Sequence, residues 1–300
     1  MKSHRLKPHR LPAAPQWPSY TGQSQFVGTS PSGRATVFVD PTLGAAAMQN
    51  ARDLVADADR ILAANDALFA TNSGDAVQVI VFALGGATDG TGGADHMACD
   101  FVSGGAIEVC AAFGNSPLCS ALLEAEISEC SMGGNLCGLS TGEALSRWCA
   151  ESVAPNVLDA FATAPTWAAD GMANFVDATD PTDQNPDSTG CGMAFLSWLQ
   201  SLSYTLPEIA QALVTLGDGA TLAGLYASLT GRPSADAWPT FSAAVQALAG
   251  GVTSDDPFAG AAPPVPAPQP PPPPPAGVTL GNAQAWAAQG LADRWPAGAP

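Results

Sequence analysis

The sequence predicts an α+β fold, because segments with strand character come first and segments with helical spacing follow them. RATVFVD, residues 34–40, alternates apolar and polar side chains as a half-buried strand does. DAVQVIVFAL, residues 75–84, is a β-branched run typical of a central strand. From Ser116 onward the apolar residues recur at helical spacing. We therefore expect strands followed by a helical half in one domain over residues 34–258.

The N-terminal half contains the predicted strands and one long helix. Residues 1–33 are rich in Pro, Ser and Gly and are predicted to be unfolded. Pro41 opens a helix whose apolar positions share one face, at Leu54, Ala58, Ile61 and Leu62. Residues 85–95 form a glycine-rich loop. The segment that follows, up to Phe113, has the pattern of a hairpin that turns at residues 103–105.

The helical half begins with SPLCSALLEAEISECSM, residues 116–132, which a pair of glycines ends. The next helix opens with Ser140 and has Glu143 three residues later, the spacing of a capping box. Further helices are expected at residues 156–176, 190–203, 206–216, 219–230 and 235–248. Residues 259–277 read as a Pro-rich linker in polyproline II conformation, and residues 278–300 as a short C-terminal tail or helix.

Charge limits the partners of this chain. It carries 27 Asp and Glu against 10 Lys and Arg, a net charge of −17, and no lysine follows Lys7. Such a surface repels nucleic acid and anionic lipid, so we expect no nucleic-acid partner and leave the peptide or protein partner open. No run of apolar residues is long enough to span a membrane. The basic start lacks the apolar core of a secretory signal, which leaves a cytoplasmic or an exported location open.

The chain has 7 cysteines, all in its middle part, and none of them forms a C-x-x-C pair. One interpretation is buried thiols in a cytoplasmic protein. The other is two or three disulfides with one thiol left over, which the scarcity of lysine and the Pro-rich tail favour mildly because they suit an oxidising compartment. In that case Cys99 and Cys110 would bridge the hairpin and Cys130 and Cys137 would staple a helix end. The remaining disulfide candidates are Cys149 and Cys191.

The stretch LLEAEISECSM, residues 122–132, places acidic side chains among small and apolar ones. Glu126 and Glu129 are i,i+3 neighbours on one helix face, and Glu124 lies mostly on another. A solvated acidic edge is one interpretation. However, no Lys or Arg lies nearby in the sequence to balance the charge. If the two carboxylates on the shared face are not solvated, they need a cation or a shared proton.

A resemblance to a known family appears further along the chain. WAADGMANFV, residues 167–176, is similar to the W-x-x-E-G-x-A-x-Y-V stretch of zincin-type, gluzincin-like metallopeptidases, closest to the basic secretory protein peptidase family. GMAFLSWLQS, residues 192–201, resembles the T-A-R-F-L-D-W-L helix that follows in that family. The resemblance covers about residues 34–215. It implies a zincin-like domain, in which a mixed sheet with a hairpin edge strand precedes the helix that bears the H-E-x-x-H motif.

The same resemblance implies site residues by position. Asp170 stands where the third zinc ligand lies and Glu126 where the catalytic glutamate lies. Ala125 and Glu129 replace the two histidines of the motif, which argues against zinc because zinc prefers imidazole and thiolate ligands. The resemblance then implies either an atypical hydrolase or peptidase with a carboxylate-rich site, or a catalytically inactive relative.

The candidate catalytic residues are Glu126, Glu129 and His96, since the edge strand borders the cleft in zincins. Asp170 and Glu129 are candidate metal ligands, and a set of oxygen ligands suits Ca²⁺, Mg²⁺ or Mn²⁺ better than zinc. In the alternative, Arg147 pairs with one of these carboxylates and the cluster is a charge-satisfied core.

DATDPTDQNPDSTGC, residues 177–191, is rich in oxygen-bearing side chains, which gives two interpretations. It is either an irregular Ca²⁺ loop or a polar loop whose side chains cap turns. The candidate ligands are Asp177, Asp180, Asp183, Asn185 and Asp187. With the cysteines, this loop supports a second function class: an exported interaction module that disulfides and calcium stabilise.

Overall fold

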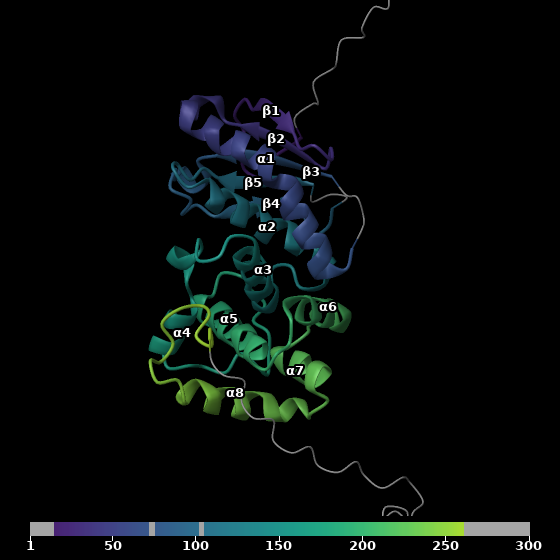
Figure 1. The fold of residues 1–300 in the computed structure, drawn as a ribbon, viewed down its shortest axis with the longest axis vertical. Coiled ribbons are helices and arrows are strands. Elements are labelled where there is room, and N and C mark those ends of the chain that lie inside the picture. Colours follow the sequence, from purple (N-terminus) through teal and green to yellow (C-terminus); the bar gives the residue numbers. More distant parts are fainter. Residues whose placement is uncertain (1–14, 72–75, 102–104, 261–300) are drawn as a thin grey trace, which may run out of the picture. The chain divides into compact units, whose positions relative to one another are not determined.

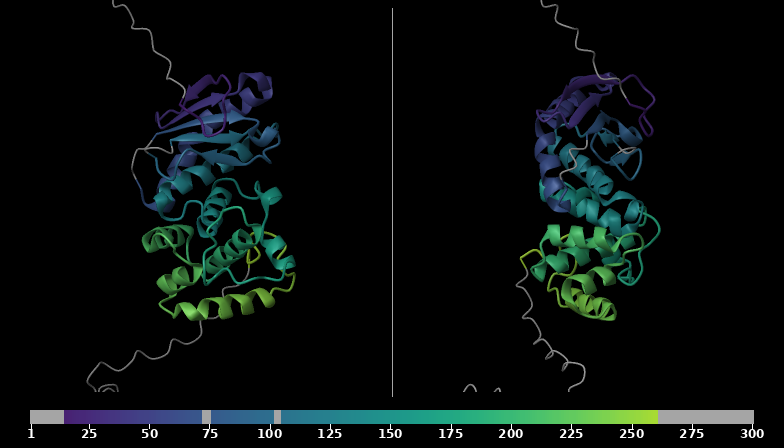
Figure 2. Two further views of the ribbon diagram at one scale, coloured as in Figure 1. Left: turned by 180° about the vertical axis from the view of Figure 1, so that it is seen from behind. Right: turned by 90° about the vertical axis from the view of Figure 1, so that its right-hand side faces the viewer.

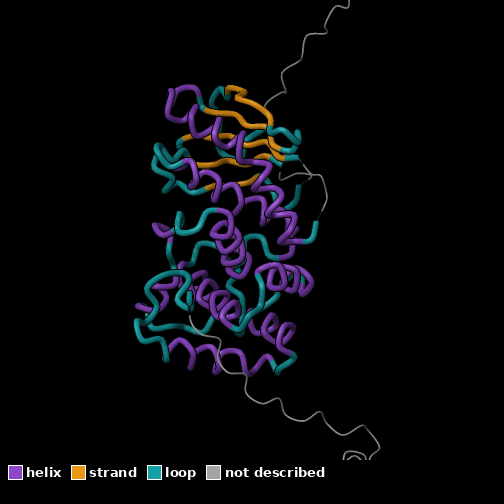
Figure 3. The backbone as a smooth tube through the Cα atoms, viewed as in Figure 1, coloured by secondary structure: helices purple, strands orange, loops and turns teal. Residues whose placement is uncertain are grey.

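The computed structural model describes residues 15–71, 76–101 and 105–260, all of which belong to one compact unit. Within these ranges, strands occur only in the N-terminal part and the later part is helical (Figure 3), so the predicted α+β class is confirmed. Several predictions lie outside the described residues: those for residues 1–14, most of the turn at 103–105, the linker after residue 260 and the tail at 278–300.

The strands form one five-stranded mixed sheet in the order β1-β2-β3-β5-β4 (Figure 1). Their bounds are β1 Gln25–Thr29, β2 Ala35–Val39, β3 Val77–Phe82, β4 Ala94–His96 and β5 Ala106–Cys110. The three central strands β2, β3 and β5 run parallel, whereas β1 and β4 run antiparallel to their neighbours. β4 is therefore an edge strand paired with the next strand along the chain, which is the expected hairpin edge.

Residues 15–33 differ from the prediction that the chain is unfolded up to residue 33. They contain β1, and the ring of Trp17 packs edge-on against Phe38 with 5.5 Å between ring centroids. The backbone N–H groups of Ser19 and Tyr20 donate to the carboxylate of Glu108 at 2.8 and 2.6 Å. This segment is folded because its aromatic side chains cover one face of the sheet, which would otherwise expose apolar residues to water.

The helices α1 (Gly44–Phe69) and α2 (Ser116–Met132) cover the other face of the sheet and pack against each other. Seen from behind, the sheet lies in front of them (Figure 2). The apolar face predicted for α1 is buried there. α2 begins after Asn115, whose side chain accepts a hydrogen bond from the Leu118 N–H, and ends at Met132, before Gly133 with its positive φ of 65°. It contacts α1, β4, β5 and the following helix, so water reaches little of it.

The helical half packs around aromatic side chains. Its helices are α3 Ser140–Val153, α4 Ala164–Ala169, α5 Pro186–Ser201, α6 Leu206–Leu216, α7 Leu222–Thr230 and α8 Ala237–Gln246. α3 joins this half to the sheet half, because it packs against both α2 and α5. The rings of Phe195, Trp198 and Phe241 meet at centroid distances of 5.0 to 5.6 Å.

Four predicted helices have different bounds: α7 begins three residues later than expected, α8 is shorter by two residues at each end, and the two largest differences are in α4 and α5. In place of a helix over residues 156–176 there are a 3-10 turn at Asp159–Phe161 and the short α4, because Pro165 is tolerated in a first helical turn but not inside a helix. α5 begins at Pro186, four residues before its predicted start, because the side chain of Asn185 caps it by accepting from the Asp187 N–H.

A candidate carboxylate and histidine site

A cavity of about 640 Å³ lies beside the edge strand β4 and is lined by α2 and α3 as well. Its ionisable lining residues are Asp95, His96, Glu126, Glu129, Glu143, Arg147 and Asp183. Apolar side chains, among them Leu122 and Phe161, complete the wall. Carboxylates therefore outnumber cationic groups in this lining, so the cavity favours a cation or a cationic side chain as its occupant.

The acidic side chains of α2 are not a solvated edge. The exposed fractions of Glu124, Glu126 and Glu129 are 0%, 8% and 8%. The cause is the packing of α2, which α1, α3 and the sheet cover from different sides. Glu126 and Glu129 thus face the cavity as a pair, whereas Glu124 lies in the core on another face.

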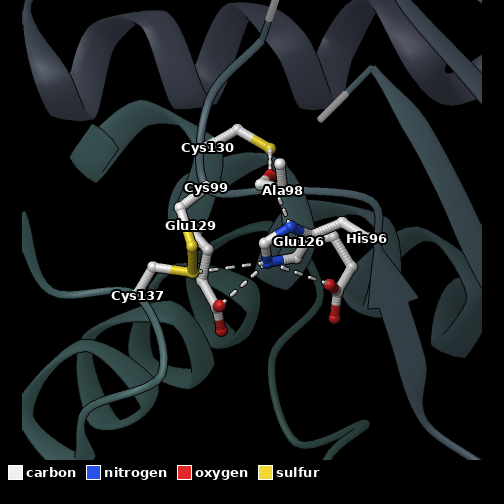
Figure 4. Close-up of a disulfide and its surroundings, with 7 residues drawn as sticks. All are labelled: His96, Ala98, Cys99, Glu126, Glu129, Cys130 and Cys137. Carbon is white, nitrogen blue, oxygen red and sulfur yellow. Dashed lines mark hydrogen bonds and ion pairs between the residues drawn. A yellow bond between two sulfur atoms is a disulfide. The ribbon is translucent and has the colours of Figure 1, made fainter. Parts of the chain in front are cut away.

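His96 joins the two cavity-facing glutamates (Figure 4). Its Nε2 lies 3.0 Å from Oε2 of Glu129 and 3.8 Å from Oε2 of Glu126. Its Nδ1 lies 2.7 Å from the carbonyl oxygen of Ala98, which only accepts, so Nδ1 carries a hydrogen. A neutral ring then presents a lone pair at Nε2 towards Glu129. The short contact therefore requires one proton between the two, held either by the imidazole or by the carboxyl group.

The surroundings of these groups favour proton uptake. Burial lowers the pKa of His96, but the hydrogen bond to Glu129 and that residue's negative charge outweigh it, so the pKa is raised above 6.5. Burial raises the pKa of Glu126 well above its usual value, and the charges of Glu129 and Glu143 add to the shift. The protonated acid is accordingly the favoured form of Glu126.

Glu143 is a cavity residue that sequence reasoning missed. The expected capping box does not form: Leu139 is the N-cap of α3, and the Ser140 hydroxyl accepts from the Asp180 N–H. Glu143 instead accepts from Nε of Arg147 at 2.6 Å. Burial raises the pKa of Glu143 to about 7, although Arg147 opposes this. The i,i+4 spacing of the pair was the signal that could have identified it.

In the alternative interpretation, we expected Arg147 to pair with a carboxylate of the cluster that contains Glu126 and Glu129, and it pairs with a different one. Arg147 forms an ion pair with Glu143, and its Nη1 donates to the Phe161 carbonyl at 3.0 Å. Within the described part of the chain, no ion pair joins Arg147 to Glu126 or Glu129. These two glutamates therefore have His96, not an arginine, as their neutralising neighbour.

Asp170 does not lie with the other predicted site residues. It follows the last residue of α4 as the C-cap, is exposed, and is absent from the cavity lining. Trp167 fixes the position of this end of α4, because its ring is buried and its Nε1 donates to the Ala173 carbonyl at 2.8 Å. The expectation that Asp170 stands beside Glu129 as a ligand is therefore corrected, because sequence similarity around the tryptophan does not bring the helix end to the cavity.

Two aspartates of the Asp-rich loop accept hydrogen bonds from nearby asparagine side chains. Asp177 accepts from the Asn174 side-chain amide at 2.6 Å, and Asp180 accepts from that of Asn185 at 2.7 Å. Asp183 is one of the residues that line the cavity. One carboxylate oxygen of Asp187 is buried without a hydrogen-bond partner among the described residues. These side chains therefore have separate surroundings, and the Ca²⁺ expectation for them stays a prediction.

One disulfide forms, between Cys99 and Cys137, with 5.8 Å between their Cα atoms. It joins the segment after β4 to the loop before α3. Both expected pairs are therefore wrong. The register explains the first, because Asp95 pairs with Glu108 and Cys110 consequently lies level with Gly93, far from Cys99. The second expected pair cannot form because Cys137 is already bonded to Cys99. The Cys130 thiol lies 3.8 Å from the Ala98 carbonyl.

The other expected disulfide candidates, Cys149 and Cys191, are buried thiols, as are Cys110 and Cys119. In the described ranges, one group of His, Cys, Asp or Glu side chains has ligand atoms close enough to hold a metal ion. It consists of His96, Glu129 and Cys137, whose ligand atoms lie within 4.8 Å of one another.

Comparison with known proteins adds no family to this description. The chain matches no protein-family model, no curated protein and no solved structure. No helix in the part of the chain that the structure describes has both the length and the apolar character needed to cross a bilayer. Any function must therefore be argued from the cavity itself.

Proposed function

We propose that this protein is a zincin-like hydrolase with an altered site, in which Glu126, Glu129 and His96 transfer protons during the cleavage of a peptide. The observation that carries the proposal is the position of His96 Nε2, at 3.0 Å from Glu129 and 3.8 Å from Glu126, in the wall of a cavity. The mixed sheet with its antiparallel edge strand, followed by the helix that bears the glutamates, supports the resemblance to zincins.

Hydrolysis needs a base that takes a proton from water and an acid that gives one to the leaving group. Groups whose surroundings push their pKa values apart can divide these roles. In the proposal, Glu129 is the base and His96 orients it: with the shared proton on the His96 imidazole, the Glu129 carboxylate keeps lone pairs that can take a proton from water. Glu126 is the acid, since burial favours its protonated form.

The edge strand β4 favours an extended peptide as the substrate. Among the described strands, β4 has a neighbour on one side only, so its outer backbone groups can pair with a further strand. A peptide bound in this way passes the cavity wall at His96. The acidic lining favours a lysine or arginine side chain next to the cleaved bond.

The proposal is tested with Glu126→Gln, which preserves the shape of the side chain but removes its acid. Against a panel of extended peptides with basic residues, we expect the rate of cleavage to fall by about 100-fold or more. Glu208→Gln is the matched control, because Glu208 lies on α6 and is not among the residues that line the cavity, and glutamine also serves in its capping box. Equal rates for the wild type and Glu126→Gln, or no cleavage by either, would contradict the proposal.

A second candidate function is the exported interaction module, and the Cys99–Cys137 disulfide favours it because disulfides persist in oxidising compartments. In this alternative the cavity binds a peptide or protein partner without cleaving it, and Ca²⁺ stabilises the Asp-rich loop. Adding a calcium chelator is then expected to lower the midpoint of thermal unfolding, as followed by calorimetry. An unchanged midpoint would remove calcium from this alternative.

A further inference from the structure

We infer that reduction of the Cys99–Cys137 disulfide creates a binding site for Zn²⁺ or a similar thiophilic cation, with His96, Glu129 and the two cysteines as ligands. This inference concerns the reduced protein and does not depend on the proposed hydrolysis.

The first observation is the distance between the ligand atoms. Nε2 of His96 lies 3.0 Å from Glu129 Oε2 and 3.9 Å from Cys137 Sγ. All three atoms lie within 4.8 Å of one another, and Cys99 Sγ is bonded to Cys137 Sγ. Zinc–ligand bonds of about 2.0–2.3 Å at tetrahedral angles separate neighbouring ligand atoms by about 3.3–3.8 Å. Small side-chain movements therefore suffice to place one cation among His96, Glu129 and Cys137, and Cys99 has to turn towards the cation once its bond to Cys137 is broken.

The second observation is the orientation of the imidazole. Nδ1 of His96 donates to the Ala98 carbonyl at 2.7 Å, and this leaves the Nε2 lone pair directed at Glu129 and Cys137 (Figure 4). Histidines that bind zinc are commonly held in this way, because the hydrogen bond at one nitrogen fixes the tautomer and the ring. The ring therefore needs no rearrangement to become a ligand.

The third observation is that the ligands come from separate elements that are already fixed. His96 ends β4, Glu129 lies in α2, and Cys99 and Cys137 lie in the loops that the disulfide joins. α2 packs directly against β4, so the folded chain holds these groups together without the cation. Two thiolates, one imidazole and one carboxylate form a set that suits Zn²⁺, whereas Ca²⁺ and Mg²⁺ take oxygen ligands.

The redox step decides whether the site exists. In the disulfide, neither sulfur is a thiolate, and only His96 and Glu129 of the four groups remain as ligands. A dithiol reductant supplies two electrons and two protons, the S–S bond breaks to two thiols, and the reductant becomes a disulfide. The cation then binds both sulfurs as thiolates and displaces the proton shared by His96 and Glu129, so three protons are released. With the cation bound, His96 and Glu129 are no longer free to transfer protons.

The test uses the purified full chain, oxidised or reduced with a phosphine, and measures Zn²⁺ binding by competition with a coloured chelator. We expect the reduced protein to bind one Zn²⁺ more than about 100-fold more tightly than the oxidised protein. Co²⁺ in place of Zn²⁺ should give a sulfur-to-metal charge-transfer band in the reduced protein only. The buried thiols are present in both forms, so they cannot produce this difference.

Variants separate this site from binding elsewhere. Cys99→Ser with Cys137→Ser should abolish the charge-transfer band and weaken Zn²⁺ binding by about 100-fold. Cys191→Ala, which removes a thiol from α5, should bind as the wild type does. Zn²⁺ should also raise the melting midpoint of the reduced wild type but not that of the double variant, which checks the result if the double variant is less stable. Equal Zn²⁺ affinity in both redox forms, or a band that survives in the double variant, would overturn the inference.

Discussion

Replacing Glu124 by leucine is expected to stabilise the protein by about 1–3 kcal/mol at pH 7, because it removes a buried carboxyl group that makes no hydrogen bond to the described part of the chain. Glu124 is 0% exposed, and neither of its carboxylate oxygens has a hydrogen-bond partner among the described residues. It lies where α2 meets α1 and α3, near the thiol of Cys149. The free energy of unfolding from denaturant titration measures the effect.

The gain should grow with pH, and the sign follows from the pKa. Burial raises the pKa of Glu124 well above 4.5; the charge of Arg60 opposes this shift and that of Asp66 adds to it. Below pH 4.5 the group is protonated in both folded and unfolded chains. Above that pH the unfolded chain releases its proton first, so the wild type loses stability as pH rises towards the folded pKa. The leucine variant does not have this loss.

Glu124→Gln is the matched control, because it removes the charge but retains buried polar atoms. It should remove the pH dependence as the leucine variant does, yet gain less stability. A leucine variant less stable than the wild type at pH 8 would show that Glu124 has a favourable partner in solution.

Replacing Gly190 by alanine is expected to destabilise the protein by about 3 kcal/mol, at the upper end of the usual cost of overpacking. A Cβ at Gly190 in α5 would overlap the backbone of Thr163 and Ala164, where α4 begins. That backbone cannot move away easily, because the N–H groups of Thr163 and Ala164 donate to Asp255 at 2.8 and 2.7 Å. Chemical denaturation of the variant measures the loss.

Gly250→Ala is the control for this substitution, since a Cβ at Gly250 meets no atom within 4 Å. Its stability should stay within about 0.5 kcal/mol of the wild type, as for most surface substitutions. If Gly190→Ala cost no more than this control, the close approach of α5 to the start of α4 would not be as described.

Helical periodicity was enough to predict that Glu126 and Glu129 share a face, because a spacing of three residues has this consequence in any α-helix. It could not predict that Glu124 is buried, since that depends on the packing of α2 against α1 and α3. The place of His96 beside the glutamates came from the resemblance to zincins, not from local pattern. Non-local packing thus decided which acidic side chains reach water.

Each failed prediction has an identifiable structural cause. The hairpin pattern was recognised, but the disulfide depended on the strand register, which places Asp95 opposite Glu108 and leaves Cys99 beyond the paired residues. Glu143 was assigned to a helix cap because the motif fits, yet its i,i+4 neighbour Arg147 competes for the same carboxylate. For Asp170, similarity in a short motif carried no information about distance from the cavity.

The bond between Cys99 and Cys137 closes a covalent ring that contains β5 and the whole of α2. A single proteolytic nick inside this ring leaves two fragments that migrate together on a gel until the sample is reduced. Glu126 and Glu129 belong to the ring, whereas His96 lies three residues outside it. A nicked but oxidised chain therefore keeps both parts of the cavity wall tethered, and gel mobility before and after reduction reports whether this ring is closed.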